Sequence, residues 1–190
     1  MEDFLDVILK RRSIRKFTDQ PLERENLLML VKAGMAGPTA MNSQPWEFLI
    51  VTEKETMDRF RKALMFAKMN APAAICVLGS KRMQKNKAGD KFWVQDCSAA
   101  AENILLAATA MGLGSVWVGV HPVGLFEKQI KNILNLPRGV TPLNLIYLGY
   151  PAEVKEARTQ YDDKRVHWGA FPKTNDLVEE VAPEEELNVS

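Results

Sequence analysis

The chain has 190 residues, of which 46% are hydrophobic and 26% are charged, and its formal net charge is +1. This length and composition predict one globular domain with a sizeable core. The near-neutral charge gives no reason to expect nucleic acid or an anionic membrane as a partner, so any basic site must be local.

Cysteine usage and the absence of targeting signals predict a cytoplasmic protein. The two cysteines, Cys76 and Cys97, both lie in apolar surroundings, which is typical of a reducing compartment rather than a disulfide scaffold. The N-terminus M-E-D-F-L-D is acidic and lacks a secretory pattern. The longest apolar stretch, 97–113, contains Glu102 and is therefore not expected to span a membrane. Two distant histidines and no Cys-x-x-Cys predict no metal site.

The chain begins with a predicted helix that leads into a cluster of positive charge. Apolar residues at positions 4, 5, 8 and 9 have helical spacing. Residues 10–17 (K-R-R-S-I-R-K-F), here called the basic segment, follow, and five of the eight are cationic. Arginine forks and a serine hydroxyl suit the charge and acceptor oxygens of a phosphate monoester. A solvated charge run has the same composition, but Ile14 and Phe17 give the segment an apolar side that favours the phosphate site.

The remaining elements follow from hydrophobic periodicity. Helices are predicted through 27–35 and over 54–69, 93–111 and 125–134, and strands over 48–52, 73–79, 112–119 and 143–148. The helix over 93–111 is apolar on nearly every side, which predicts a central position or a subunit interface. Residues 183–190 have no core-forming pattern.

Two loops have compositions that suggest ligand contacts. Residues 38–48 (P-T-A-M-N-S-Q-P-W-E-F) combine prolines, two carboxamides and a tryptophan. Carboxamides both donate and accept, which suits a heterocycle with alternating N–H and C=O groups, although a polar loop capped by a core tryptophan has the same composition. Residues 80–91 carry five cations, as either a lid that attracts an anionic substrate or a solvated connection.

Four motifs in order give the chain a family resemblance. R-R-S-I-R-K-F, P-T-A-M-N-S-Q-P-W-E-F, G-L-G-S-V-W-V-G and L-G-Y-P-A-E together resemble the FMN-dependent nitroreductase family over residues 2–168. The resemblance implies an α+β fold, a nitroreductase-like three-layer α/β/α sandwich with a mostly antiparallel sheet, in an intertwined homodimer with two FMN sites at the interface. It assigns residues 1–170 to the FMN-binding domain and 171–190 to a C-terminal extension, either extended on the partner subunit or disordered.

The resemblance also implies how the basic segment contacts FMN. Arg11, Arg12 and Ser13 match the family's phosphate contacts. Arg15 matches the basic position near N1 and C2=O of the flavin ring, where a cation tunes the reduced ring.

A second cationic pair usually closes over the phosphate in this family. Arg158 matches its first position, but Gln160 occupies the second, which removes one charge from the clamp. Lys155 or Lys164 could compensate for that charge.

The rest of the implied site comes from two other segments. Pro38, Thr39, Ala40 and Asn42, with Gln44 beside them, match a loop that approaches the cofactor from the opposite subunit. Val118 and Gly119 match the positions whose backbone N–H groups meet N5 and O4.

The activity implied by the resemblance is hydride transfer from NADH or NADPH through flavin N5 to nitroaromatics, quinones or related acceptors. The implied mechanism is ping-pong and needs no side-chain nucleophile.

Three alternatives to this activity stay open. The first is another reductive role in the family, dehalogenase-like or flavin-consuming, and the second is a non-catalytic flavin or nucleotide binder. The third is a nucleic-acid-binding or phospho-regulated module, since R-R-S-I resembles a kinase site. We expect a homodimer and a small-molecule acceptor, and neither nucleic acid nor membrane as a partner.

Overall fold

A computed structural model describes residues 4–171 of the chain. The chain has two compact units, and the boundary between them follows Arg158. The described part of the second unit contains one short 3-10 helix, η2 (Asp163–Arg165), where the Asp162 carboxylate accepts a hydrogen bond from the Lys164 N–H at 3.1 Å. The predicted extension 171–190 lies outside the described residues except for Phe171.

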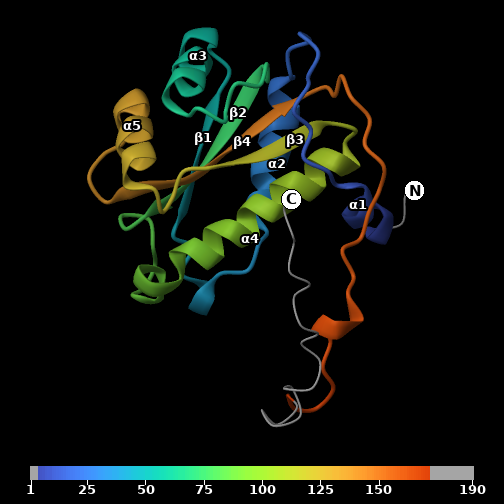
Figure 1. Ribbon diagram of the computed structural model, residues 1–190. Coiled ribbons are helices and arrows are strands. Elements are labelled where there is room, and N and C mark those ends of the chain that lie inside the picture. Colours follow the sequence, from blue (N-terminus) through green and yellow to red (C-terminus); the bar gives the residue numbers. More distant parts are fainter. Residues whose placement is uncertain (1–3, 172–190) are drawn as a thin grey trace, which may run out of the picture. The chain divides into compact units, whose positions relative to one another are not determined.

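The first unit is built on a four-stranded antiparallel sheet in the order β1-β2-β4-β3. The strands are β1 (Trp46–Val51), β2 (Ala73–Ser80), β3 (Gly114–Gly119) and β4 (Val140–Gly149). The helices are α1 (Phe4–Lys10), α2 (Arg24–Met35), α3 (Lys54–Ala63), α4 (Ala88–Ala110) and α5 (Gly124–Leu134), with a 3-10 turn η1 (Ala40–Asn42). Helices α2 and α4 cover one face of the sheet, and α3 and α5 cover the other (Figure 1). The predicted α+β sandwich with an antiparallel sheet is confirmed.

The core has two halves because successive side chains of a strand point to opposite faces. On β4, Tyr147 is buried in the half that α3 and α5 complete, whereas Ile146 is buried in the half under α2 and α4. Helix α4 fills the second half with Ala101 and Ile104, both fully buried. The prediction that this long apolar helix is buried is confirmed for the face that packs on the sheet; whether it also forms a subunit interface stays a prediction.

Two predicted helix boundaries are wrong for identifiable reasons. Helix α3 ends at Ala63 rather than near residue 69, because Leu64 is extended (φ −114°, ψ 107°). Leu64 and Ala67 are nevertheless fully buried, so an apolar spacing that suggested helix belongs to a packed loop. Helix α4 begins at Ala88, five residues before the predicted start at Trp93. The prediction missed this first turn because the turn carries no hydrophobic periodicity.

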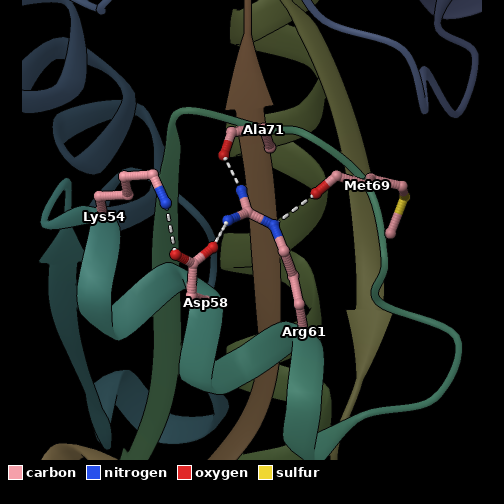
Figure 2. Close-up of polar contacts among 5 residues, drawn as sticks. All are labelled: Lys54, Asp58, Arg61, Met69 and Ala71. Atoms are coloured by element: carbon pink, nitrogen blue, oxygen red, sulfur yellow. Dashed lines mark hydrogen bonds and ion pairs between the residues drawn. The ribbon is translucent and has the colours of Figure 1, made fainter.

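Arg61 ties helix α3 to the segment that leads into β2 (Figure 2). Its guanidinium donates to the carbonyl oxygens of Met69 at 2.8 Å and Ala71 at 2.7 Å, and to Asp58 at 2.6 Å. Lys54, on the outer side, pairs with the other oxygen of Asp58 at 2.6 Å. Arg61 thus satisfies two carbonyl groups that no ladder or helix hydrogen bond reaches.

Replacing Arg61 with Met should lower the free energy of unfolding by about 2–4 kcal/mol. The substitution keeps the apolar stem but leaves two carbonyl groups unpaired, each at a cost of about 1–3 kcal/mol. Lys54→Met is the matched control, because the Lys54 side chain is 88% exposed and should change stability by less than about 0.5 kcal/mol. Urea denaturation measures both; equal effects would contradict this role for Arg61.

Within residues 4–171, no helix has the length and apolar character needed to cross a membrane.

Candidate functional site

The basic segment is held along the start of β3 by backbone pairing. Ser13 forms a parallel bridge with Ser115, and Phe17 forms an antiparallel bridge with Pro151. The Asn70 carboxamide closes this end, accepting from the Phe17 N–H at 3.1 Å and donating to the Phe17 carbonyl at 2.6 Å. Phe17 is 3% exposed, so the prediction that the segment has an apolar side that packs is confirmed.

Two side chains of the segment after β4 bind the main chain of the basic segment, and this pair of contacts is here called the clasp. The Glu153 carboxylate accepts a hydrogen bond from the Arg15 N–H at 2.6 Å. The Lys155 ammonium donates to the Ser13 carbonyl at 2.6 Å and pairs with Glu153 at 3.2 Å. Lys155 therefore already has two partners and is poorly placed to replace the charge missing at Gln160. Lys164, the other residue considered for that role, belongs to the second unit.

The clasp predicts a pH dependence. The Arg15 N–H, followed by Lys155, lowers the pKa of Glu153 below its ordinary value of 4.5. A lowered carboxyl pKa contributes stability above the unfolded-state pKa, and this stability is lost as the pH falls through the folded-state value. The Tm difference between wild type and Glu153→Gln should therefore be present at pH 7 and shrink progressively as the pH falls below 4.5. A Tm difference that stays constant from pH 7 to pH 3 would contradict a stabilising role for the ionised Glu153 carboxylate in its contacts with Arg15 and Lys155.

The arginines of the basic segment keep most of their donors available. Arg11 Nε lies 3.4 Å from Glu102 of α4, across a pair whose side chains are 31% and 51% exposed. The Arg12 guanidinium donates to the backbone carbonyl of Glu156. Among residues 4–171, the Arg15 guanidinium has one hydrogen-bond acceptor, the carbonyl of Ser13 at 3.5 Å. Each guanidinium has five N–H donors, so an anion could bind without breaking these contacts.

The two predicted clamp residues fall in different units. The Arg158 N–H donates to the Leu9 carbonyl of α1 at 3.2 Å, which places its main chain beside the helix that precedes Arg11. Its side chain is exposed. Gln160 is exposed and belongs to the second unit.

Strand β3 presents a backbone donor on its free edge. The Val120 N–H donates to the Leu143 carbonyl of the β4 segment at 3.1 Å. Main-chain groups of an antiparallel pair alternate in direction, so Val118 also faces β4, whereas Ser115 and Gly119 face outward. The Ser115 carbonyl confirms this direction, because it accepts a hydrogen bond from the basic segment. Of the two predicted N5 and O4 donors, Gly119 is therefore the one whose N–H lies on the open edge.

The edge of β3 has the dimensions of a phosphorylated flavin. Ser115, beside the basic segment, and Gly119 are four positions apart, which is about 13 Å along a strand. This span suits a ribityl phosphate followed by the edge of a ring. A Cβ added at Gly119 would have only Trp117 Nε1 within 4 Å among the described residues, at 3.9 Å, so the face of the strand at this position is uncrowded. The residues present thus fit a bound FMN.

The loop Pro38–Gln44, here called the carboxamide loop, is anchored by a buried carboxylate. Asp96 of α4 is 4% exposed. It accepts from the Ala40 N–H at 2.9 Å and from the Ser43 hydroxyl at 2.9 Å. Asp96 was missed by sequence reasoning; the available signal was an acidic residue directly before the run of small residues 97–101 in α4.

The carboxamide loop has an unusual backbone. Met41, Asn42 and Gln44 have φ values of 49°, 54° and 47°, in the left-handed region that costs energy for residues other than glycine. The Gln44 amide donates to Asn42 Oδ1 at 2.8 Å, and the Gln44 N–H donates to the Thr39 hydroxyl at 3.2 Å. Pro38 and Asn42 are exposed. Such strain marks a loop whose shape is imposed by its surroundings.

The two predicted halves of the site attach to different turns of α4. The basic segment contacts Glu102 and the carboxamide loop contacts Asp96, six residues or about 9 Å apart along a helix. A cavity of about 980 Å³ lies elsewhere, at the N-terminal ends of α2 and α3, and is lined by none of the predicted cofactor residues. The candidate site is therefore an open edge of the sheet in the single chain.

Comparison with known proteins identifies the family. The sequence model of a family described as "Nitroreductase family" matches residues 8–67 and 64–150 of this chain. A protein of Archaeoglobus fulgidus provisionally named NADH dehydrogenase/NAD(P)H nitroreductase is 40% identical over 172 residues, covering 88% of this chain and 98% of that one.

Solved structures with a similar fold point to the same family. A provisionally named NADH dehydrogenase/NAD(P)H nitroreductase from Parabacteroides distasonis has a TM-score of 0.84 at 37% identity, covering 90% of this chain and 100% of that one. An FMN-dependent nitroreductase from Clostridium difficile has a TM-score of 0.79 at 32% identity, covering 88% and 99%. On sequence and fold together, this chain belongs to the nitroreductase family.

Proposed function

We propose that the protein is an FMN-dependent oxidoreductase that reduces nitroaromatics, quinones or related electron-poor acceptors with NADH or NADPH. The observation that carries this proposal is the edge of β3, where a cationic segment lies at one end and the outward N–H of Gly119 at the other. Relatives named as FMN-dependent nitroreductase and FMN reductase [NAD(P)H] support the cofactor and the reductant.

In this proposal each part of the site has one physical role. Arg11, Arg12 and Ser13 bind the phosphate, with Arg158 beside them. Arg15 supplies a fixed positive charge near N1 and C2=O, which favours negative charge on the reduced ring. The outward N–H of Gly119 orients the ring at N5 and O4, whereas the N–H of the other predicted donor, Val118, faces β4 and does not contact the ring.

Bound FMN would supply hydride acceptance and donation at N5. The carboxamide loop would cover the ring with Pro38, Thr39, Ala40 and Asn42. The Gln44 side chain holds Asn42 in place by donating a hydrogen bond to its Oδ1. One face of the ring then stays accessible, so reductant and acceptor bind in turn. This arrangement predicts ping-pong kinetics.

We propose that two chains form the functional unit, with the carboxamide loop of one chain completing the site of the other. In the single chain, the apolar side chains of Phe4 and Ile8 on α1 are 67% and 42% exposed, and Met29 on α2 is 52% exposed. The edge strand β1 is apolar, yet five of its six residues are only half-buried. Exposed apolar helices and an uncovered apolar edge strand are features that a partner normally covers.

Spectroscopy and kinetics test the proposed function directly. The purified protein should show bound-flavin absorbance at one FMN per chain, and this absorbance should bleach on addition of NADH or NADPH and return with a quinone. Double-reciprocal plots at several acceptor concentrations should be parallel. A folded protein that binds no FMN refutes the proposal, and one that binds FMN without reduction by either nicotinamide is a flavin binder only.

A further inference from the structure

A second group of positive charges lies beside the carboxamide loop, on the connection from β2 to α4. Residues 81–87, here called the lysine loop, are joined to the carboxamide loop by two hydrogen bonds. The Lys85 N–H donates to the Ser43 carbonyl at 2.7 Å, and the Asn86 carboxamide donates to the Met41 carbonyl at 3.0 Å. The lysine loop therefore keeps a fixed position next to the proposed cover of the flavin.

Other contacts make the lysine loop an ordered structure. The Lys81 N–H donates to the Gly139 carbonyl at 3.0 Å, and the Gln84 N–H donates to the Ser80 carbonyl at 3.3 Å. The Asn86 side chain also accepts from the Ala88 N–H at 3.0 Å, at the start of α4. A connection with this many backbone hydrogen bonds is a preformed surface rather than a mobile lid.

Only part of the positive charge in this region is neutralised. Arg82 makes a bidentate pair with Glu47 at 2.8 and 2.6 Å, and Lys81 lies 4.0 Å from Asp90. Among the described residues, no carboxylate lies within ion-pair distance of the remaining three lysines, which are all exposed: Lys85, Lys87 and Lys91.

These three lysines lie close together in the chain, where the lysine loop passes into α4. Lys87 and Lys91 are separated by four positions at the start of α4, so they lie on one face of the helix. Lys85 comes two residues before Lys87, at the hydrogen bond to Ser43. Three like charges without an acidic partner repel one another, and a polyanion bound among them would relieve this repulsion.

We propose that Lys85, Lys87 and Lys91 bind the phosphates of NADH or NADPH while the nicotinamide lies against the flavin. This inference rests on the proposed function and adds the site of the reductant. The nicotinamide must reach N5 at the open edge, so the pyrophosphate extends past the carboxamide loop to the adjoining lysine loop. NADPH carries an additional phosphate, so the lysines should contribute more to its binding than to that of NADH. The net charge of +1 suits a small polyanion better than a nucleic acid.

The test is equilibrium binding of tetrahydro-NADPH, an analogue that cannot transfer hydride, to FMN-loaded protein by calorimetry. The variant Lys85→Ala/Lys87→Ala/Lys91→Ala should bind the analogue about 10-fold to 100-fold more weakly, since each of the three exposed lysines contributes about twofold to fivefold to the affinity. The control Lys62→Ala/Lys68→Ala/Lys128→Ala removes three other exposed lysines, so it has the same net charge. The salt dependence of log Kd should also become shallower in the first variant only.

Kinetics provide a second measure. The KM for NADPH should rise by a similar factor and the KM for NADH by less, while kcat and the KM for an uncharged quinone stay within about twofold. Equal analogue affinity in the two triple variants would overturn the assignment of the lysines. FMN content, measured on the same samples, separates the two proposals: absence of FMN refutes the proposed function, whereas full FMN content with unchanged analogue affinity refutes the lysine site alone.

Discussion

Replacing both Arg11 and Arg12 with alanine should weaken FMN binding by about two to four orders of magnitude. A charge-assisted hydrogen bond is worth about 1.5–3 kcal/mol, and each 1.4 kcal/mol is a factor of ten in Kd. Fold stability should change little, because Arg11 makes an exposed ion pair with Glu102 and such pairs contribute about 0–1 kcal/mol. Flavin fluorescence titration at fixed ionic strength measures Kd, and thermal unfolding of the flavin-free protein measures stability.

The control for this prediction is Arg59→Ala/Arg138→Ala, which removes two exposed arginines outside the basic segment. It produces the same change in net charge and should bind FMN as wild type does. Equal losses of affinity in the two double variants would mean that the basic segment acts only through the overall charge. Unchanged affinity in the Arg11/Arg12 variant would remove the segment from the phosphate site.

The second large effect is expected at Asp96. Asp96→Ala leaves the Ala40 N–H and the buried Ser43 hydroxyl without their acceptor, so the strained carboxamide loop should relax toward more favourable φ values. We expect stability to fall by about 1–3 kcal/mol for each group left unsatisfied and reductase activity to be largely lost. Asp96→Asn keeps an acceptor of the same shape and should retain most of both.

A mixed dimer shows whether the loop acts on its own chain or on the partner. One chain carries Arg11→Ala/Arg12→Ala and the other carries Asp96→Ala, with different affinity tags so that the heterodimer can be purified. If the loop completes the partner's site, one site has both defects and the other has none, so about half of wild-type activity should return. If the loop serves its own chain, both sites stay defective and no activity returns, which would contradict the proposed exchange between subunits.

Much of the fold could be predicted from the sequence because its elements are strongly periodic. The spacing of Leu27, Leu30 and Val31 places α2, and the apolar run 73–79 places β2 within one residue. The exceptions were one helix end without a hydrophobic pattern and one apolar pattern that continues beyond the end of its helix. The start of α4 at Ala88 is polar, and the apolar residues after Ala63 pack as a loop.

The sequence by itself determined which segments we propose for the site: the basic segment, the carboxamide loop and the end of β3 are local motifs that can be recognised one at a time. Only the tertiary structure decided how these motifs are supported. Asp96 lies more than fifty residues from the loop that it anchors, and Glu153 and Lys155 reach back to Arg15 and Ser13 across nearly the whole chain. Contacts of this kind depend on which strands and helices become neighbours, and no local pattern of residues encodes them.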